Sequence, residues 1–253
     1  MVGGEIPSAH GVTGHAPLGE GRRPAPQWRP MTRRELLAVA VGVALYVGLA
    51  VDAMRQTSAT YDEPAHLSAA WTHLRLHDYR LSPDHPPLVQ SLAAVPLVFL
   101  DVKMDPADEA WGEHAIWRFA RRWLYHWNDA GRLLFWGRLP IVFLAAALAV
   151  AIFLWARARF GPAPALVALF LAVLSPDLLA HGQLVTTDLG AAAFIFLAVV
   201  AFDAALPRTT PGRLLLAGLA LGAALASMAL RAGHTPMPAS GVALLALQSA
   251  VPP

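Results

Sequence analysis

The chain has 253 residues, of which 56% are hydrophobic and 14% are charged, with a formal net charge of +2. This composition excludes an ordinary soluble globular domain and indicates an integral membrane protein. Its basic residues are arginines apart from Lys103, and they lie scattered at the ends of apolar runs, which argues against a nucleic-acid partner. The chain has no cysteine, which excludes disulfides, thiolate metal sites and thiol catalysis.

The N-terminal segment, residues 1–33, is rich in Gly, Pro, Ala and Arg and has no apolar periodicity. It predicts a disordered tail. The apolar run Leu36–Ala53 follows several arginines and is longer than the core of a signal peptide. We therefore expect an uncleaved membrane span with a cytoplasmic N-terminus.

Five apolar runs approach the roughly 20 residues that a spanning helix needs. They are Leu36–Ala53, Leu139–Trp155, Ala163–Leu179, Leu189–Leu206 and Leu214–Leu230. Because lipid-exposed backbone must satisfy its own hydrogen bonds, these runs predict an all-α fold of about five transmembrane helices, with further helices at the outer membrane surface.

A sixth apolar run, Leu88–Leu100, is shorter and contains Pro96, so we expect a re-entrant or interfacial segment. If this run does not cross the membrane, four later arginines lie on the cytoplasmic side, as the positive-inside bias requires. They are Arg157, Arg159, Arg208 and Arg213. The same topology places the loop 55–138 on the outer face of a bacterial inner membrane. The membrane module then covers residues 34–230.

Within the outer loop, residues 106–127 interleave four tryptophans with arginines, which is typical of a helix lying in the membrane interface. Plain interfacial anchoring is the simplest interpretation of this segment. Arg132 and Arg138, just before the second span, are better placed to bind a lipid phosphate.

The leading catalytic candidates are Asp62 and Glu63, followed by Pro64. Ionisable residues next to a membrane are usually functional, and a positioned carboxylate can act as a general base. The alternative is that Asp62 only caps a helix from about Pro64 to Leu76. In that helix, His66 would lie one turn from Asp62 on the same face.

Two further acid-bearing segments precede apolar runs. Asp84 and His85, before a Pro-Pro pair, predict a divalent metal site, although Asp and Pro are also ordinary turn residues. Asp188, preceded by His181, begins the fourth span, where an acid also suits the positive end of the helix dipole. We interpret Asp188 and His181 as substrate-binding candidates, because three such acidic helix starts are expected on one side of the membrane.

The ordered motifs resemble the N-terminal half of the polyprenyl-phosphate-dependent GT-C glycosyltransferases, a group that includes protein O-mannosyltransferases and aminoarabinose transferases. The motifs are residues 61–66 (YDEPAH), 84–88 (DHPPL), 132–140 (RLLFWGRLP), 174–182 (LSPDLLAHG), 186–188 (TTD) and 216–222 (LAGLALG).

The resemblance implies transfer of a sugar from a polyprenyl-phosphate donor to an acceptor hydroxyl at the outer membrane face, with inversion at the anomeric carbon. It implies that Asp62 is the general base and that Asp84 helps to bind a metal. Glu63 and Asp188 match further acidic positions near the substrates. Membrane lipids and an acceptor lipid, glycan or protein are the expected partners.

The resemblance ends near Leu225, and the segment 231–253 predicts a disordered tail of different character. We therefore expect a truncated copy with weak activity or none. Two other classes of function stay open. A non-catalytic membrane subunit or lipid-binding scaffold would leave the acids far apart, whereas a proton-coupled transporter would bury them at mid-membrane.

Overall fold

The computed structural model describes residues 30–83, 85 and 87–227, and every regular element in these ranges is helical. The all-α class is thus confirmed for the described residues. The elements are α1 (Arg33–Gln56), α2 (Glu63–Leu76), α3 (Leu88–Ala94), the 3-10 turn η1 (Pro96–Phe99), α4 (Glu109–Gly112), α5 (Ile116–Tyr125), α6 (Ala130–Phe160), α7 (Pro162–Val173), α8 (Pro176–His181), α9 (Asp188–Ala205) and α10 (Pro211–Leu225). The predicted tails lie largely outside the described residues.

Three of the described helices, α1, α6 and α9, are long and apolar enough to cross a membrane. They contain the first, second and fourth predicted spans. The other two predicted spans are shorter than expected: α7 has 12 residues and α10 has 15. At 1.5 Å per residue, α7 rises only about 18 Å, against a hydrocarbon core of about 30 Å.

The predicted run Ala163–Leu179 is interrupted because α7 ends at Val173 and α8 begins at Pro176. Proline has no backbone N–H and favours the first turn of a helix. The Ser175 hydroxyl accepts a hydrogen bond from the Leu178 N–H and caps the new helix. A single straight span over this run was therefore the wrong expectation.

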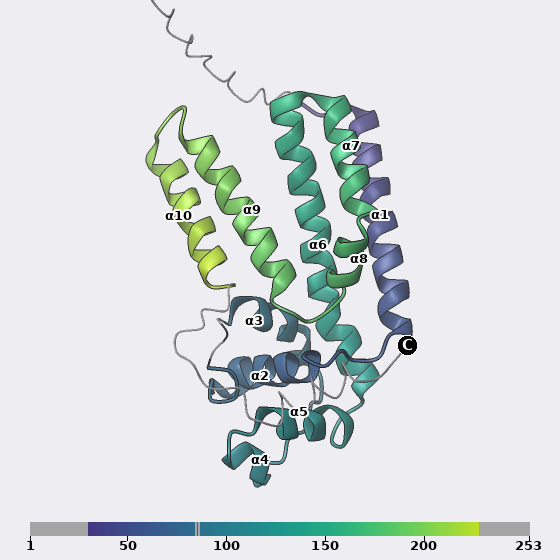
Figure 1. Cartoon of the computed structure of the whole chain (residues 1–253), viewed down its shortest axis with the longest axis vertical. Coiled ribbons are helices and arrows are strands. Elements are labelled where there is room, and N and C mark those ends of the chain that lie inside the picture. The colour runs from purple at the N-terminus through teal and green to yellow at the C-terminus, as the bar shows by residue number, and fades with distance from the viewer. Residues whose placement is uncertain (1–29, 84, 86, 228–253) are drawn as a thin grey trace, which may run out of the picture.

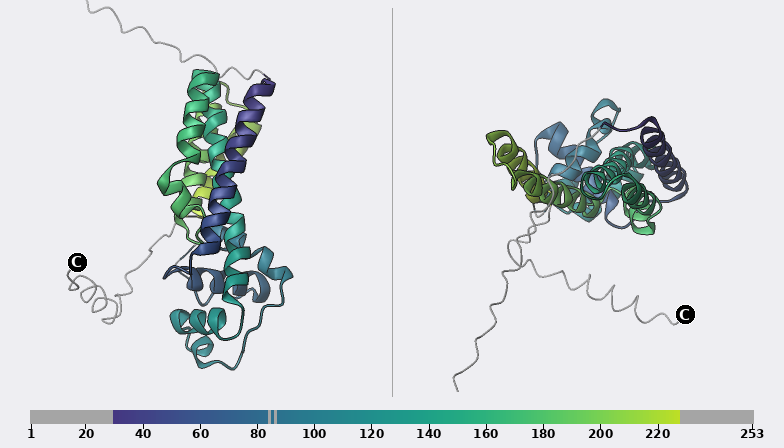
Figure 2. Two further views of the ribbon diagram at one scale, coloured as in Figure 1. Left: turned by 90° about the vertical axis from the view of Figure 1, so that its right-hand side faces the viewer. Right: turned by 90° about the horizontal axis from the view of Figure 1, so that it is seen from above.

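The long apolar helices pack with two shorter ones into a bundle, which we define as α1, α6, α7, α9 and α10. Seen from above, α10, α9 and α6 follow one another in a curved row, with α1 and α7 beyond α6 (Figure 2). The start of α1 and the α6–α7 and α9–α10 turns lie at one end of the bundle (Figure 1). Two ion pairs join helices at this end: Arg157 of α6 pairs with Glu35 of α1, and Arg159 of α6 pairs with Asp203 of α9.

Helices α2 to α5 lie at the opposite end of the bundle and form what we call the end layer, residues 57–129 (Figure 1). The run Leu88–Leu100 belongs to this layer: it divides into α3 and η1 at Pro96, and α3 packs on α2. This arrangement agrees with the expectation that the run does not extend through the bundle.

The segment 106–127 contains α4 and α5, and its tryptophans differ in burial. Trp123 is fully buried and packs against Trp71 of α2 with ring centroids 6.0 Å apart. Trp117, by contrast, is half exposed. Part of the aromatic content of this segment therefore belongs to the core of the end layer, because α5 packs on α2.

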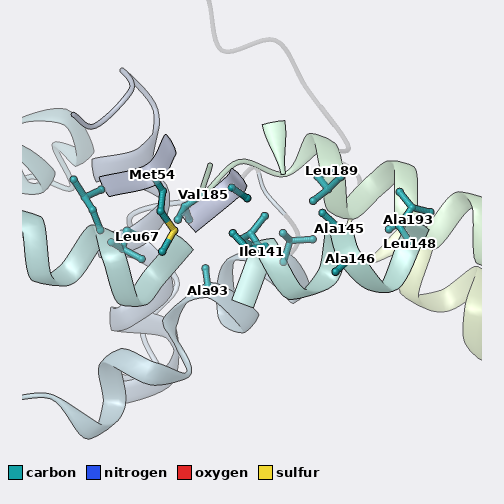
Figure 3. Close-up of a cluster of buried hydrophobic side chains, with 14 of the residues drawn as sticks. Met54, Leu67, Ala93, Ile141, Ala145, Ala146, Leu148, Val185, Leu189 and Ala193 are labelled. Atoms are coloured by element: carbon teal, nitrogen blue, oxygen red, sulfur yellow. The ribbon is translucent and has the colours of Figure 1, made fainter. Parts of the chain in front are cut away.

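The core continues from the end layer into the bundle. Figure 3 shows buried apolar side chains from both regions in one cluster, among them Leu67 of α2, Ala93 of α3, Ile141 of α6 and Leu189 of α9. The start of α9 comes close to α3 at Gly190, where an added Cβ would lie 2.1 Å from Val89 Cγ2. This packing fixes the position of the first turn of α9 beside the end layer.

Candidate functional site

Asp62 occupies the N-cap position of α2, but its side chain makes no capping hydrogen bond. The Glu63 carboxylate turns back toward the residues before the helix, where its Oε2 accepts a hydrogen bond from the Thr60 N–H at 2.9 Å. Asp62 is exposed, and its carboxylate forms no ion pair or hydrogen bond with the described residues. The capping alternative therefore does not account for the Asp62 side chain, which is exposed to solvent.

Glu63 is fully buried and pairs with Arg138, which is also fully buried. Arg138 Nε donates to Glu63 Oε1 at 2.8 Å, and Nη2 donates to Oε2 at 2.6 Å. The remaining N–H groups of Arg138 donate to the carbonyl oxygens of Met54, Thr57 and Ser58 at 2.8–3.0 Å. The guanidinium thus joins the end of α1, the start of α2 and α6.

The Glu63 carboxylate also accepts from the Val185 N–H at 3.0 Å, which connects the α8–α9 loop to the same point. Burial alone would raise the pKa of Glu63, but the hydrogen bonds from Arg138, Thr60 and Val185 outweigh it and lower this pKa. The charges of Glu63 and Arg138 therefore compensate each other inside the protein. This geometry favours a structural role for Glu63 and Arg138 over the predicted roles in catalysis and substrate binding.

A histidine that the sequence analysis did not assign to the site, His66, lies at the centre of the candidate site. Gln90 Nε2 lies 2.8 Å from His66 Nδ1, and the rings of His66 and His85 meet edge to face with centroids 5.1 Å apart. Burial, and then the neighbouring His85, lower the pKa of His66, whereas Asp62 and Asp188 act in the opposite direction. Of these three charged or titratable neighbours, His85 is the one in ring contact with His66, whereas Asp62 and Asp188 act on it through their charge.

Asp188 lies exposed in the first turn of α9, and the preceding Thr187 makes no side-chain capping bond. His181 is exposed at the end of α8, and no hydrogen bond or ring contact among the described residues connects it to His66. Of the two predicted substrate-binding residues in this region, Asp188 influences the pKa of His66 through its charge, and His181 is not among the causes of that shift.

Arg132 is exposed in the first turn of α6, and its guanidinium has no hydrogen-bond partner within the described residues. One turn further, on the same face of α6, Trp136 lines an apolar groove of about 470 Å³. The groove is formed by α6 with α3 and η1, through Leu92, Pro96, Trp136, Leu139, Pro140, Phe143 and Leu144. A cationic side chain thus stands at one end of an apolar groove.

The predicted metal site is described only in part, because Asp84 lies outside the described residues. His85 is half-buried, and its Nδ1 lies 3.4 Å from Ser82 Oγ. Within the part of the chain that the structure describes, no group of three or more His, Asp or Glu side chains is placed to hold a metal ion. The metal site stays a prediction.

No protein-family model, curated protein or solved structure matches this chain. The resemblance to GT-C glycosyltransferases therefore depends on the short motifs alone. The features of the molecule that bear on function are the exposed Asp62 beside His66 and the groove beside Arg132.

Proposed function

We propose that this chain is a GT-C type glycosyltransferase module that transfers a sugar from a polyprenyl-phosphate donor to an acceptor hydroxyl, with Asp62 as general base. The observation that carries the proposal is the exposed carboxylate of Asp62, unpaired in the described part of the chain and one helical turn before His66, whose ring contacts that of His85. A group of this kind, exposed at the edge of an apolar bundle, is typical of a catalytic site rather than of structural ion pairing.

In this mechanism, Asp62 accepts the proton of the acceptor hydroxyl while the hydroxyl oxygen forms a bond to the anomeric carbon. The bond between that carbon and the phosphate oxygen breaks on the opposite side, which inverts the configuration and releases polyprenyl phosphate. A positioned base contributes typically about 10²- to 10⁴-fold in rate. The released phosphate carries negative charge, which a nearby guanidinium stabilises.

The donor fits the features around Arg132. A polyprenyl chain is apolar and suits the groove along α6, and the donor phosphate suits an unpaired arginine one turn away. Because Arg138 is committed to Glu63, Arg132 is the better candidate of the two for the lipid phosphate.

The proposed topology follows from the distribution of arginines. Arg157 and Arg159 end α6, while Arg208 and Arg213 flank the α9–α10 turn, at the same end of the bundle as the start of α1. The positive-inside bias makes this end cytoplasmic and the end layer periplasmic. In this proposal α7 with α8, and α10, complete five crossings of a bacterial inner membrane.

The test of the base is Asp62→Asn in the chain reconstituted in nanodiscs, supplied with undecaprenyl-phosphate mannose or undecaprenyl-phosphate aminoarabinose and assayed for sugar loss from the lipid. We expect a fall of at least about 10²-fold in rate. Asp177→Asn, an exposed acid on α8, is the matched control and should retain the parent rate. Transfer that survives Asp62→Asn would remove Asp62 from the mechanism.

A second candidate is a non-catalytic lipid-binding scaffold, which the apolar groove beside Arg132 favours. It predicts that the donor lipid is retained through purification without being consumed. Arg132→Gln should then reduce lipid retention, as measured by native mass spectrometry, while Asp62→Asn should leave retention and all other properties unchanged. The scaffold function does not require the exposed carboxylate of Asp62.

A further inference from the structure

A second cavity lies in the end layer, between the loop before α2 and helix α5. It measures about 230 Å³ and is partly open to solvent. Its lining residues are Ala59, Thr60, Tyr61, Pro64, Trp117, Ala120, Arg121 and Tyr125. It is distinct from the groove along α6, since the two have no lining residue in common.

Two aromatic rings form one wall of this cavity. Tyr61 and Trp117 lie with ring centroids 4.7 Å apart and planes inclined by 31°. Tyr61 is 76% exposed and Trp117 is 49% exposed, so the pair is available to a ligand. The electron-rich face of an aromatic ring attracts the positive edges of C–H bonds, which the face of a sugar ring presents.

Arg121 places an uncompensated positive charge at the same cavity. The other two arginines of α5 are paired, Arg118 with Glu113 and Arg122 with Asp108. Arg121 has no hydrogen bond or ion pair within residues 30–83, 85 and 87–227, although it shares the helix with both of them. A guanidinium in this state is suited to a phosphate or carboxylate, which it can bind through two parallel hydrogen bonds.

We propose that this cavity binds one sugar ring that carries a negatively charged group, with the ring on Tyr61 and Trp117 and the charge at Arg121. Its volume lies below the roughly 300–1,000 Å³ of pockets for larger ligands, which favours a single ring over an oligosaccharide. Tyr61 directly precedes Asp62, so the ring is bound next to the proposed base. Its assignment as the acceptor subsite rests on the proposed function, whereas binding itself does not.

The charged sugar can come from a soluble sugar phosphate or from the headgroup of a phosphorylated glycolipid. Glucose 6-phosphate is the soluble probe, and dodecyl glucoside 6-phosphate is the lipid-like probe. If the second binds at least tenfold more tightly, the site takes a headgroup at the membrane surface. Equal binding of the two probes indicates a soluble ligand.

The experiment is isothermal titration of the full chain in zwitterionic nanodiscs with glucose 6-phosphate, glucose and inorganic phosphate. We expect glucose 6-phosphate to bind at least tenfold more tightly than either of the other two, because each lacks one of the two interactions. Trp117→Ala and Arg121→Gln should each weaken this binding at least tenfold, which corresponds to about 1.4 kcal/mol. Arg118→Gln, which alters a paired arginine on the same helix, is the control and should bind as the parent does.

Two results would overturn the site. One is binding of inorganic phosphate as tight as that of glucose 6-phosphate, which would indicate simple attraction of an anion. The other is binding that is absent or that is unaffected by Trp117→Ala. Asp62→Asn should retain the sugar. If the parent chain binds the sugar but does not transfer to it, the cavity is supported and only its assignment as an acceptor subsite is contradicted.

Discussion

Arg138 and Glu63 lie 75 residues apart in the chain and form a two-point ion pair that is fully buried where the bundle meets the end layer. Every N–H group of the guanidinium faces an acceptor, and both carboxylate oxygens accept more than one hydrogen bond. The pair therefore fixes the start of α2, and with it Asp62, against the loop that leads to Asp188.

The first prediction concerns this pair. Arg138→Met leaves a buried carboxylate without its partner, and we expect a loss of about 3–5 kcal/mol in stability, since breaking one side of a buried pair is strongly destabilising. The double variant Arg138→Met/Glu63→Leu should lose less than Arg138→Met alone, because it removes both charges. Thermal unfolding of the purified protein in detergent measures both effects.

Arg132→Met is the matched control for this prediction, because Arg132 is an exposed arginine on the same helix with no partner among the described residues. Its effect should stay within about 0.5 kcal/mol. If Glu63→Leu is also measured alone, a double variant whose loss equals the sum of the Arg138→Met and Glu63→Leu losses would show that the two residues are not coupled.

The second prediction concerns protonation of His66. Burial and His85 lower its pKa from the model-compound value of 6.5. Between the folded-state pKa and about 6.5, the unfolded chain therefore binds a proton that the folded chain does not, so stability falls as pH falls through this window. Above about pH 6.5, His66 contributes no pH dependence. We expect His66→Gln to reduce the loss of stability on acidification from about pH 7.5 to about pH 5.5.

The same histidine reports on its neighbours. Asp62 and Asp188 each raise the pKa of His66 against the larger opposing effects, so Asp62→Asn and Asp188→Asn should each lower it further. NMR titration of nitrogen-15-labelled histidine side chains measures the shift. Asp177→Asn is the control and should leave the titration of His66 unchanged. If neither Asp62→Asn nor Asp188→Asn moves it, the acids do not share a site.

Local signals in the sequence were sufficient for the long spans but not for the shorter ones. Long apolar runs predicted α1, α6 and α9 because span length depends only on consecutive residues. The break between α7 and α8 was also present in the sequence as Ser175 and Pro176, a cap residue followed by a helix-starting proline. A count of apolar residues does not show this break, because the residues on both sides of it are apolar.

The site was predictable in part. Three acid-bearing helix starts led to the expectation that the acids converge on one side of the membrane, which stays a prediction; Asp62 and Asp188 both act on His66 through their charge. The pairing of Glu63 with Arg138 was not predicted, because it depends on how α2 packs against α6. One signal was available: Arg138 stands within an apolar stretch of its helix, and such an arginine needs a buried partner. The contact of Gln90 with His66 had no such signal in the sequence.

The third prediction tests the packing that places Asp188. An alanine Cβ at position 190 would lie 2.1 Å from Val89 Cγ2 and 3.1 Å from Val89 Cβ, so α9 would have to move away from α3. We expect Gly190→Ala to destabilise the protein by about 1–3 kcal/mol, as overpacking does. Gly218→Ala in α10 is the control: nothing lies within 4 Å of its added Cβ, so helix propensity should leave it neutral or stabilise it by up to about 1 kcal/mol. Thermal unfolding compares the two variants, and equal midpoints would mean that α9 does not depend on close contact with α3.

In the NMR titration, Gly190→Ala should also lower the pKa of His66 by moving Asp188 away. A loss of packing elsewhere in the bundle would not produce this effect.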